Sequence, residues 1–428
     1  MLGIIVAVFA ASFILPFLFP IGKALCVVAA GLVVVDMLMI FHPQAKIEGE
    51  RKLPKIFSLG DPNTVKLVLY NDYGVTLNAT VVDELPVQFQ KRDFGFQTQL
   101  TPYEEKEFTY ELTPKERGEY QFGALNIFLT SFFGLMERRI RNEVPMSIPV
   151  YPSVIQMKRF TLLAFSKTAH FQGIKKLRRL GHSYEFEQIK NYVRGDDYRS
   201  INWKATSRRG ELMVNQYEDE RAQQVYSIID KSRTMKMPFN GMSLVDYAIN
   251  TSLVIANVAL QKHDRAGLIS FSDKIGTVVR ADRSANQLQR ILNALYREKE
   301  RTNEANYELL FRSARRIVKG RSLLFLYTNF ESLSALERVL PLLRKINILH
   351  LLVVIFFENT EIIEYAKQDA KDLRGIYNQT IAHKFVAEKQ QIVQKLRQYG
   401  IQAILTSPDN LSVNTINKYL ELKSRGLI

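Results

Sequence analysis

The sequence of 428 residues has very few of the side chains that build disulfides or thiolate metal sites. It contains one cysteine, Cys26, and six histidines. A single cysteine excludes intramolecular disulfides and thiolate zinc sites, and a chain of this size without disulfides fits a reducing compartment. The histidines are scattered without the H-E-x-x-H spacing, and neither a G-x-x-x-x-G-K-[ST] loop nor a G-x-G-x-x-G loop after a strand occurs. The motifs of zinc hydrolases and of nucleotide-binding enzymes are therefore missing.

Acidic residues are too few to balance the basic ones, which leaves a formal charge of +15. This excess permits binding to nucleic acid, to an anionic membrane or to an acidic protein, and does not choose among them. The composition is otherwise ordinary, with 46% hydrophobic and 24% charged residues. We therefore expect a folded chain without long disordered stretches, of a length that suits two or three domains.

Long stretches without charge occur only at the N-terminus. Residues 1–19 contain no charged side chain, and residues 24–41 form a second apolar run broken only by Asp36. Each run approaches the roughly 20 residues that cross a bilayer, and "PIGK" at 20–23 predicts a turn between them. A secretory signal peptide is the alternative, but its basic start is missing and a second run follows at once. We expect residues 1–42 to form two transmembrane helices.

Basic residues after the second run indicate the orientation. Lys46, Arg51, Lys52 and Lys55 follow it, whereas Lys23 is the only charge in the predicted turn. The positive-inside rule then places the rest of the chain in the cytoplasm. Asp36 is expected near the membrane interface, protonated or paired between helices, with a functional intramembrane acid as the alternative.

Residues 45–150 show the two-residue alternation of strands. Stretches such as "TVKLVLYN" and "EFTYELTP" alternate apolar and polar side chains, and turn signals such as "GDPN" and "KERGEY" separate them. This pattern predicts an antiparallel, Ig-like β-sandwich. No cluster of catalytic side chains and no phosphate loop is visible in it, so we expect a spacer or binding module.

Residues 151–224 form a polar, basic connecting segment. It contains "YEFEQIKNYVRGDDYRSINWKATSRRGELMVNQYEDE", which runs from residue 184 to 220 and includes the only tryptophan, Trp203. Asp196 and Asp197 are either a catalytic or metal-binding pair or, as we favour, the start of a helix that Gly210 ends. The aromatic residues indicate that part of the segment is anchored. The mixture of basic and aromatic residues also permits nucleic-acid binding, but the interleaved acids argue against it.

Strands and helices alternate in residues 225–428. Apolar runs such as "VYSIID", "SLLFLYTN" and "HLLVVIFF" alternate with amphipathic stretches, the first of which begins with Ser243 and Asp246 in the manner of a capping box. Continuous apolar strands of this kind are typical of a parallel sheet with helices on both faces. We expect a doubly wound, Rossmann-type α/β domain, in which ligands bind beyond the carboxyl ends of the strands.

The first strand of this domain ends in one carboxylate and two hydroxyls at alternate positions, Asp230, Ser232 and Thr234. Oxygen ligands of this kind suit Mg²⁺ or Ca²⁺. Two later loops at the same edge carry Thr302 and Asn329, and Thr328 precedes Asn329. The alternative is that these residues only cap helices and turns. An amide at 329 supplies less charge than an aspartate, and Lys231 and Arg233 add positive charge, so both features weaken cation binding.

The long basic segment and the strand "SIIDKSRTM" after it resemble a bacterial family known as domain of unknown function fifty-eight. The pieces "RGEYQFG", "SFFGL", "VYPSV" and "KYLELKSRGLI" support the resemblance, which covers most of the chain after the apolar N-terminus. Members of the family have a membrane hairpin, a β-sandwich and a von Willebrand factor A-like domain, are encoded beside MoxR-type AAA+ ATPases and have no established enzymatic activity. The resemblance implies a degenerate metal-ion-dependent adhesion-type site with Mg²⁺ or another divalent cation at Asp230, Ser232 and Thr234, with Thr302 as a further ligand. It also implies a partner surface, to which we assign the conspicuous residues of the segment: Tyr184, Glu185, Arg194, Gly195, Asp196, Asp197, Arg199, Trp203, Lys204, Arg208 and Glu218.

The sequence therefore predicts a membrane-anchored, non-enzymatic adaptor at the bacterial inner membrane. Its partner would be a MoxR-type ATPase or a client of that ATPase, in protein maturation or envelope assembly, and nucleic acid is not expected to bind. One alternative is a metal-dependent hydrolase that uses Asp196, Asp197 and Asp230. A second is a structural envelope protein that self-associates.

Overall fold

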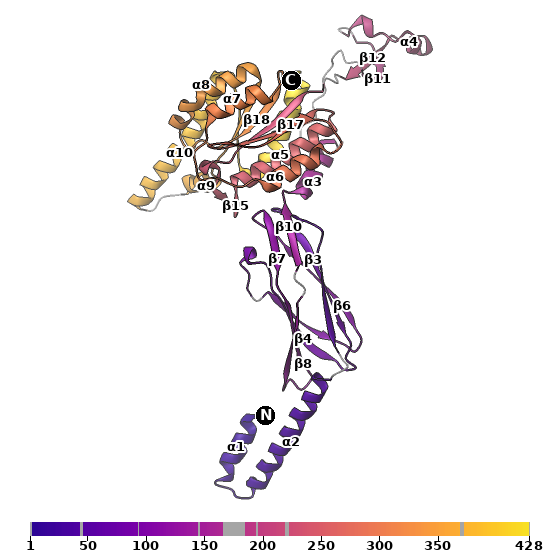
Figure 1. Cartoon of the computed structure of the whole chain (residues 1–428), viewed down its shortest axis with the longest axis vertical. Coiled ribbons are helices and arrows are strands. Elements are labelled where there is room, and N and C mark those ends of the chain that lie inside the picture. Colours follow the sequence, from indigo (N-terminus) through magenta and orange to yellow (C-terminus); the bar gives the residue numbers. More distant parts are fainter. Residues whose placement is uncertain are drawn as a thin grey trace. The chain divides into compact units, whose positions relative to one another are not determined.

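The computed structural model of the chain describes residues 2–42, 46–92, 94–143, 146–165, 185–193, 196–218, 222–368 and 372–427. The chain divides into two compact units, residues 1–150 and 151–428. The structure confirms a mixed α/β chain with an apolar N-terminal helix and antiparallel sheets in its N-terminal half (Figure 1).

The N-terminal helices differ in length. Helix α2 (Leu18–Ile40) has 23 residues, so at about 1.5 Å per residue it is long enough for a hydrocarbon core of about 30 Å. Helix α1 (Leu2–Ser12) has only 11 residues, fewer than the roughly 20 that cross a bilayer. Of these two helices only α2 is long enough to span a membrane, and the pair of spanning helices stays a prediction. The chain turns at residues 13–17 rather than 20–23. Pro20 lies in the first turn of α2, where a missing N–H is tolerated, and therefore does not mark the turn.

The first unit also contains three antiparallel sheets, in the orders β1-β3-β6, β2-β10-β7 and β5-β4-β8-β9. Their apolar cluster draws on β1, β3, β4 and β8, so the first and third sheets pack face to face. The strands are β1 (Ile47–Lys52), β2 (Phe57–Ser58), β3 (Asn63–Asn71), β4 (Leu77–Asp83), β5 (Gly95–Leu100), β6 (Glu105–Leu112), β7 (Gly118–Phe122), β8 (Leu125–Thr130), β9 (Glu137–Asn142) and β10 (Met146–Tyr151), with a short 3-10 helix at Val87–Phe89.

One of the basic residues used to orient the chain is not a surface charge. Arg51 is buried in β1, where its guanidinium forms an ion pair with Asp83 and lies 4.8 Å from the ring centroid of Phe122. The Asp83 carboxylate also accepts a hydrogen bond from the Tyr110 hydroxyl at 2.5 Å. Arg51 is therefore a core residue of the first unit, which leaves Lys46, Lys52 and Lys55 to support the orientation.

The second unit is built around a six-stranded sheet with the order β17-β16-β13-β18-β19-β20. Strands β16, β13, β18, β19 and β20 are parallel, and the edge strand β17 is antiparallel to β16, which the sequence did not predict. The strands are β13 (Gln224–Asp230), β14 (Pro238–Phe239), β15 (Met242–Ser243), β16 (Arg265–Phe271), β17 (Ile275–Asp282), β18 (Leu323–Tyr327), β19 (Leu351–Phe357) and β20 (Gln402–Thr406). The helices are α3 (Val154–Phe165), α5 (Leu244–Gln261), α6 (Gln287–Arg297), α7 (Tyr307–Ile317), α8 (Leu333–Leu349), α9 (Thr360–Lys367), α10 (Leu373–Gln398) and α11 (Leu411–Ser424), with 3-10 turns at Arg233–Met235 and Pro408–Asn410.

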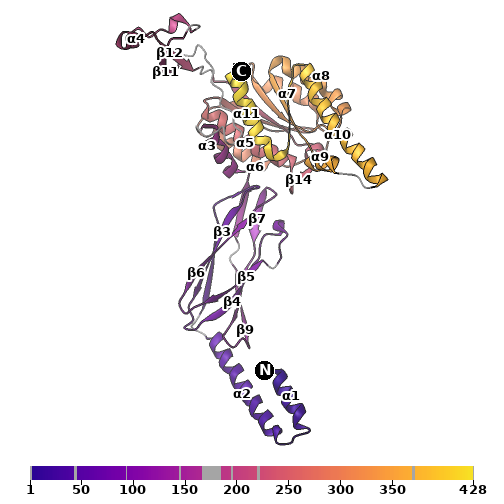
Figure 2. The ribbon, with the colours of Figure 1, turned by 180° about the vertical axis from the view of Figure 1, so that it is seen from behind.

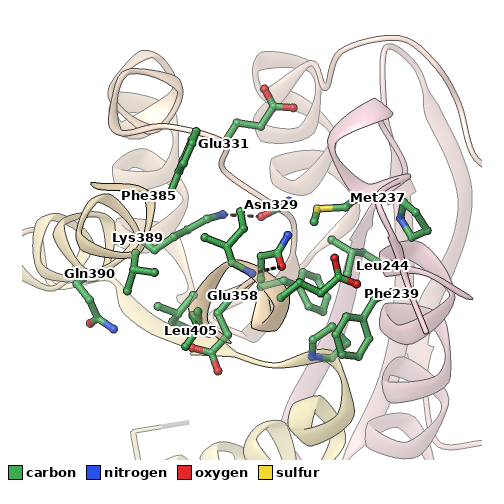
Figure 3. Close-up of a pocket in the computed structure, with 18 residues that line it drawn as sticks. Met237, Phe239, Leu244, Asn329, Glu331, Glu358, Phe385, Lys389, Gln390 and Leu405 are labelled. Atoms are coloured by element: carbon green, nitrogen blue, oxygen red, sulfur yellow. Dashed lines mark hydrogen bonds between the residues drawn. The ribbon is translucent and has the colours of Figure 1, made fainter. Parts of the chain in front are cut away.

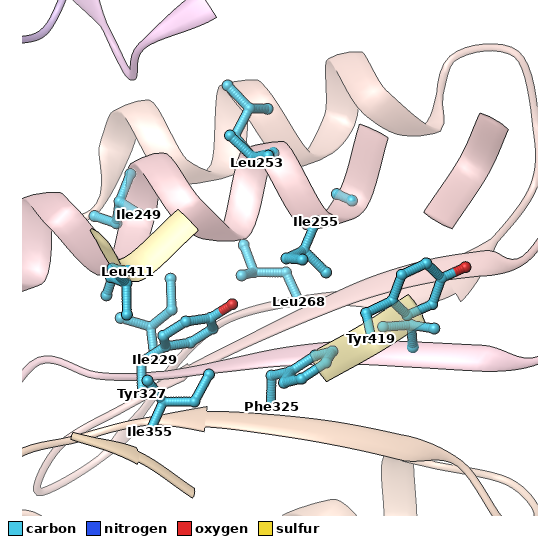
Figure 4. Packing of buried hydrophobic residues seen from close by; sticks show 14 of the residues in the cluster. Ile229, Ile249, Leu253, Ile255, Leu268, Phe325, Tyr327, Ile355, Leu411 and Tyr419 are labelled. Carbon is cyan, nitrogen blue, oxygen red and sulfur yellow. The ribbon is translucent and has the colours of Figure 1, made fainter. Parts of the chain in front are cut away.

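Two apolar clusters cover the two faces of this sheet. Figure 2 shows the helices around the sheet, and Figure 4 shows side chains of the first cluster. One is formed with α5, α6 and α11, and the other with α7, α8 and α10. Alternate residues of β18 enter opposite clusters, with Phe325 on the first face and Leu326 on the second, as the two-residue period of a strand requires. Helix α5 begins where the sequence predicts, because the Ser243 hydroxyl accepts a hydrogen bond from the Asp246 N–H.

Candidate functional site

The loop after β13 brings together three of the predicted oxygen ligands. Asp230 ends the strand, and its Oδ1 atom accepts a hydrogen bond from the Ser232 backbone N–H at 2.9 Å. The Ser232 and Thr234 hydroxyl oxygens lie 3.2 Å apart. The loop therefore folds back on its own aspartate, which places one carboxylate and two hydroxyls at the carboxyl edge of the sheet.

The Asp230 carboxylate is buried and is occupied by internal hydrogen bonds. Its Oδ2 atom accepts bonds from the Thr328 hydroxyl at 2.7 Å and from the Tyr307 hydroxyl at 3.5 Å. Burial raises the pKa of Asp230, although the hydrogen bonds from Ser232, Thr328 and Tyr307 act in the opposite direction. Tyr307 begins helix α7, and its part in this network has no signal in the sequence.

Lys231 does not add positive charge beside Asp230, as the sequence suggested. Its side chain is buried and forms an ion pair with Glu298. The same glutamate accepts hydrogen bonds from the Ser270 hydroxyl at 2.6 Å and the Thr277 N–H at 3.1 Å. Arg233 is exposed and lies 3.5 Å from an exposed carboxylate oxygen of Glu304. Lys231 therefore stabilises the base of the loop.

Asn329 is connected to the same loop and to a buried lysine. Its Nδ2 atom donates to the Thr234 carbonyl at 3.2 Å, and its Oδ1 atom accepts a hydrogen bond from the Lys389 Nζ atom at 2.8 Å (Figure 3). Lys389, in α10, also donates to the Phe330 carbonyl at 2.6 Å. Burial lowers the pKa of Lys389 to about 8, although Glu331 and Glu388 act in the opposite direction. At pH 7 this side chain is an ammonium ion.

These contacts test whether a divalent cation fits the predicted ligands. Asp230 is the only carboxylate among them, and both of its oxygens already accept hydrogen bonds. The Asn329 oxygen accepts its bond from a cation, which a bound metal ion would have to displace. The described residues contain no group of three His, Cys, Asp or Glu side chains arranged to hold a metal. The residues present do not fit a tight site for Mg²⁺ or Ca²⁺.

The structure places Thr302 on a neighbouring loop, with its side chain exposed. Two backbone hydrogen bonds connect the loops, from Arg301 N–H to the Lys231 carbonyl at 2.9 Å and from Arg233 N–H to the Asn303 carbonyl at 3.2 Å. Thr302 therefore belongs to the same edge of the sheet as Asp230.

A mostly apolar pocket of about 200 Å³ opens beside Asn329 (Figure 3). Strand β14, the start of α5, helices α9 and α10 and the ends of β19 and β20 contribute to its walls. Phe239, Leu244, Phe385 and Leu405 contribute apolar surface, and Lys389 reaches Asn329 from the same wall. A pocket of this kind accommodates an apolar side chain or a small apolar ligand.

The basic segment folds as a small module, which we call the signature module. Strands β11 (Glu185–Asn191) and β12 (Met213–Glu218) form an antiparallel hairpin, and helix α4 (Trp203–Arg209) lies between them in sequence. Asn202 caps α4 by accepting a hydrogen bond from the Ala205 N–H, and Gly210 ends it in the left-handed conformation with φ 73°. The predicted C-terminal end is therefore confirmed.

The predicted start of this helix is wrong, because Asp196 and Asp197 lie before it. The Asp196 carboxylate accepts hydrogen bonds from the Val193 N–H and the Lys190 ammonium group, both at 2.9 Å, and these contacts lower its pKa. Asp197 accepts from the Arg199 N–H and caps a 3-10 turn at Tyr198–Ser200. Both acids therefore stabilise the module itself.

Two aromatic residues of the module, Trp203 and Tyr198, are on its surface, so they are not the residues that anchor it. The side chain of Trp203 is 69% exposed and that of Tyr198 is 68% exposed, whereas Met213 and Val214 supply the buried contacts. The guanidinium of Arg199 lies 5.7 Å from the Tyr198 ring centroid. The module therefore presents aromatic and basic groups outward.

The remaining predicted residues of the partner surface divide into three groups. Lys204 and Arg208 are exposed on α4. Glu185 and Glu218 are paired in the β11–β12 ladder. Tyr184, Arg194 and Gly195 lie outside the described residues.

Comparisons with known proteins agree with the family that the sequence resembles. Residues 188–357 match the model of a family described as "Protein of unknown function DUF58". An uncharacterized protein, YeaD, from Bacillus subtilis is 25% identical over 201 residues. That match covers 45% of this chain and 50% of YeaD, so the chain spans about half the length of this relative.

One similar solved structure is the conserved hypothetical protein BatB from Bacteroides thetaiotaomicron. It matches with a TM-score of 0.31 and 12% identity, and the match covers 47% of this chain and 99% of BatB. The CARDB domain of PF1109 from Pyrococcus furiosus matches with a TM-score of 0.19 and 18% identity over 25% of this chain and 93% of that domain. The family model runs from within β11 through the Asp230 loop to the end of β19, so the resemblance found in the sequence is confirmed over residues 188–357.

Proposed function

We propose that this chain is a membrane-anchored adaptor without catalytic activity of its own, which binds a partner protein through the signature module. The observation that carries the proposal is the outward position of Trp203 and Tyr198 on a module whose two aspartates, Asp196 and Asp197, bond to groups of the module itself. Tryptophan, tyrosine and arginine are the residues that most often dominate binding energy in protein interfaces. An exposed tryptophan beside basic side chains therefore suits a protein partner.

The carboxyl edge of the large sheet is a second part of the proposed binding region. We assign the sheet to the von Willebrand factor A-like class, because its first strand, β13, is central and its edge strand is antiparallel. In open α/β sheets ligands bind at this edge. The Asp230 loop would contact the partner without a metal ion, since Lys389 already supplies a positive charge there.

The partner that the family resemblance implies is a MoxR-type AAA+ ATPase or its client protein. Helix α2 would hold the chain in the inner membrane, with the folded units in the cytoplasm. The basic residues Lys46, Lys52 and Lys55 after α2 support this orientation. An acidic partner surface would suit the outward basic groups of the module, Arg199, Lys204 and Arg208.

Neither alternative has comparable support. A hydrolase that uses Asp196, Asp197 and Asp230 would need free carboxylates, yet each of these accepts hydrogen bonds from its own neighbourhood. Self-association predicts oligomers of the detergent-solubilised chain, and light scattering separates this outcome from a monomer.

Capture of a MoxR-type AAA+ ATPase tests the proposal. The full chain in detergent would be immobilised and the purified ATPase titrated onto it with ATP. We expect Trp203→Ala to weaken binding by roughly 30-fold, which corresponds to about 2 kcal/mol for a dominant interface residue. Tyr377→Ala is the matched control, since Tyr377 is 67% exposed on α10, outside the module. Equal capture by wild type and Trp203→Ala would overturn the proposed surface.

A further inference from the structure

The loop between β8 and β9, residues 131–136, carries apolar side chains on its surface and lies against the last turns of α2. Its sequence is "SFFGLM". The side chain of Phe132 is 88% exposed, and Phe133 and Leu135 are also exposed. The two phenylalanine rings contact each other edge to face, with centroids 6.0 Å apart. An exposed pair of aromatic rings in a folded unit indicates a surface that something else covers.

A buried aspartate fixes this loop to the helix. Asp36 lies in α2, four residues or about 6 Å before Ile40, and is fully buried. Its carboxylate accepts hydrogen bonds from the Ser131 hydroxyl, from the Leu135 N–H at 3.0 Å and from the Met136 N–H at 2.7 Å. An acid in an otherwise apolar helix is costly unless it is paired in this way. Asp36 therefore holds the loop at a defined level along α2.

A second set of contacts fixes the end of the helix to the same unit. The Ile40 carbonyl accepts hydrogen bonds from the Tyr73 hydroxyl at 2.8 Å and from an Arg138 guanidinium nitrogen at 3.0 Å. The same nitrogen donates to the Tyr73 hydroxyl at 2.9 Å. Both sets of hydrogen bonds connect the last turns of α2 to the first unit, one through the loop and one through Tyr73 and Arg138.

We infer that residues 131–136 insert into the membrane interface and form a second membrane contact beside α2. This inference rests on the proposed anchoring of the chain by α2. The loop lies at the level of Asp36, inside the apolar stretch of α2, and exposed apolar residues of the helix such as Leu38 lie within about one turn of that level. Aromatic rings are favoured at the boundary of headgroups and acyl chains, about 5–10 Å into the bilayer. A lipid surface therefore suits the two phenylalanines.

A fluorescent label on single cysteines tests the insertion. Cys26 is the only native cysteine, so the Cys26→Ala chain would carry Phe132→Cys, Leu38→Cys or Val87→Cys, each labelled with a nitrobenzoxadiazole group. The full chain would be reconstituted into phosphatidylcholine and phosphatidylglycerol vesicles, with or without lipids that bear a nitroxide near the headgroup. Val87 is the control because it is 89% exposed and lies after β4, away from the loop. The start of β4 pairs with the end of β8 that leads into the loop, at Asn78 and Thr130, whereas the end of β4 pairs with the start of β8, at Asp83 and Leu125.

We expect the label at position 132 to shift to shorter wavelength and to lose at least about half of its emission to the nitroxide lipids. The label at position 87 should show neither change. Quenching at 38 with none at 132 would overturn the inference and leave the anchor in place, whereas no quenching at either position would overturn both. A blue shift at 132 without quenching would mean contact with protein and would also overturn the inference.

Discussion

The ammonium group of Lys389 lies 2.8 Å from the side-chain oxygen of Asn329, at the edge of the sheet where the sequence suggested a metal ion. Helix α10 thus delivers a cation to the position of a predicted ligand. The charged groups at this edge therefore have hydrogen-bond partners within their own domain. Asp230 accepts a hydrogen bond from the Thr328 hydroxyl, and Lys389 donates one to the Phe330 carbonyl.

The first prediction concerns metal binding. Millimolar Mg²⁺ should leave the thermal unfolding of the wild-type chain unchanged. The double variant Asn329→Asp, Lys389→Met replaces the amide by a carboxylate and removes the ammonium group, so Mg²⁺ should stabilise it by about 1.4 kcal/mol at roughly ten times its dissociation constant. Circular dichroism is the suitable probe, because the only tryptophan, Trp203, lies outside the sheet.

The contradicting result would be equal stabilisation of wild type and variant by Mg²⁺. Ca²⁺ and Na⁺ at matched ionic strength serve as controls for a general salt effect on surface charges.

The second prediction is that Asp230→Asn stabilises the chain. Burial raises the pKa of Asp230, which means that the folded state disfavours the charged form. An amide retains an acceptor for the Ser232 N–H, and the Thr328 and Tyr307 hydroxyls can turn to accept its N–H groups. We expect a gain of about 0.5–2 kcal/mol at pH 7.

The sign of the pH dependence follows from the raised pKa. Above the folded pKa the wild type carries the full penalty of a buried charge. As the pH falls towards the ordinary value of 3.8, the native carboxyl takes up a proton before the unfolded one does, so the advantage of the variant shrinks. Urea unfolding of wild type and Asp230→Asn at several pH values measures this difference in stability. A difference that grows as the pH falls would contradict the raised pKa of Asp230.

Much of the edge could be predicted because its signals are local. Asp230, Ser232 and Thr234 follow an apolar strand at alternate positions, and the carboxyl end of such a strand has a known place in the sheet. Tyr307 and Lys389 could not be found in this way, because they reach the site from 77 residues beyond Asp230 and 60 residues beyond Asn329. Helix periodicity shows that a residue faces the core, but not which distant side chain it contacts.

Two other differences have equally definite causes. The uncharged run at residues 1–19 does not show how long its helix is, because the length depends on where the chain turns. Helix α1 ends at Ser12, well within that run. The aromatic residues of the basic segment indicated that part of it is anchored, but not whether Trp203 is among the buried residues. Its exposure depends on which face of α4 meets Met213 and Val214, and a seven-residue helix has too little periodicity to show this.

The third prediction concerns the buried pair of Lys231 and Glu298. Removing one partner leaves an uncompensated charge, so Glu298→Gln should lower the free energy of unfolding by about 3–5 kcal/mol. The double variant Lys231→Met, Glu298→Gln should lose less than the single one, because no charge is then left unpaired. Both variants would be measured by urea unfolding at pH 7, and equal losses would contradict this prediction.

This pair also has a pH signature. Burial raises the pKa of Glu298, but the hydrogen bonds from Lys231, Ser270 and Thr277 lower it by more than burial raises it. The pKa of Glu298 is therefore below its ordinary value of 4.5. Its contribution to stability is therefore complete above pH 4.5 and is lost as the pH falls through the lower, folded value. The difference between wild type and Glu298→Gln should narrow over that acid range.

The last prediction concerns the contact between Asp36 and the loop at 131–136. Asp36→Ala removes the acceptor of two backbone N–H groups, those of Leu135 and Met136. Unpaired amides open to solvent more readily, so hydrogen exchange in a peptide covering 131–136 should accelerate by roughly tenfold or more, which corresponds to at least about 1.4 kcal/mol of lost protection.

Strand β3 provides the internal control for this measurement, because its ladders with β1 and β6 do not involve Asp36. Its exchange should remain slow in the Asp36→Ala chain, which would show that the first unit is still folded. Faster exchange in β3 as well would mean that Asp36 supports the whole unit, and unchanged exchange at 131–136 would mean that the loop is held by other contacts. Asp36→Asn separates charge from hydrogen bonding, since its remaining oxygen can still accept from one N–H group, and an intermediate rate is expected there.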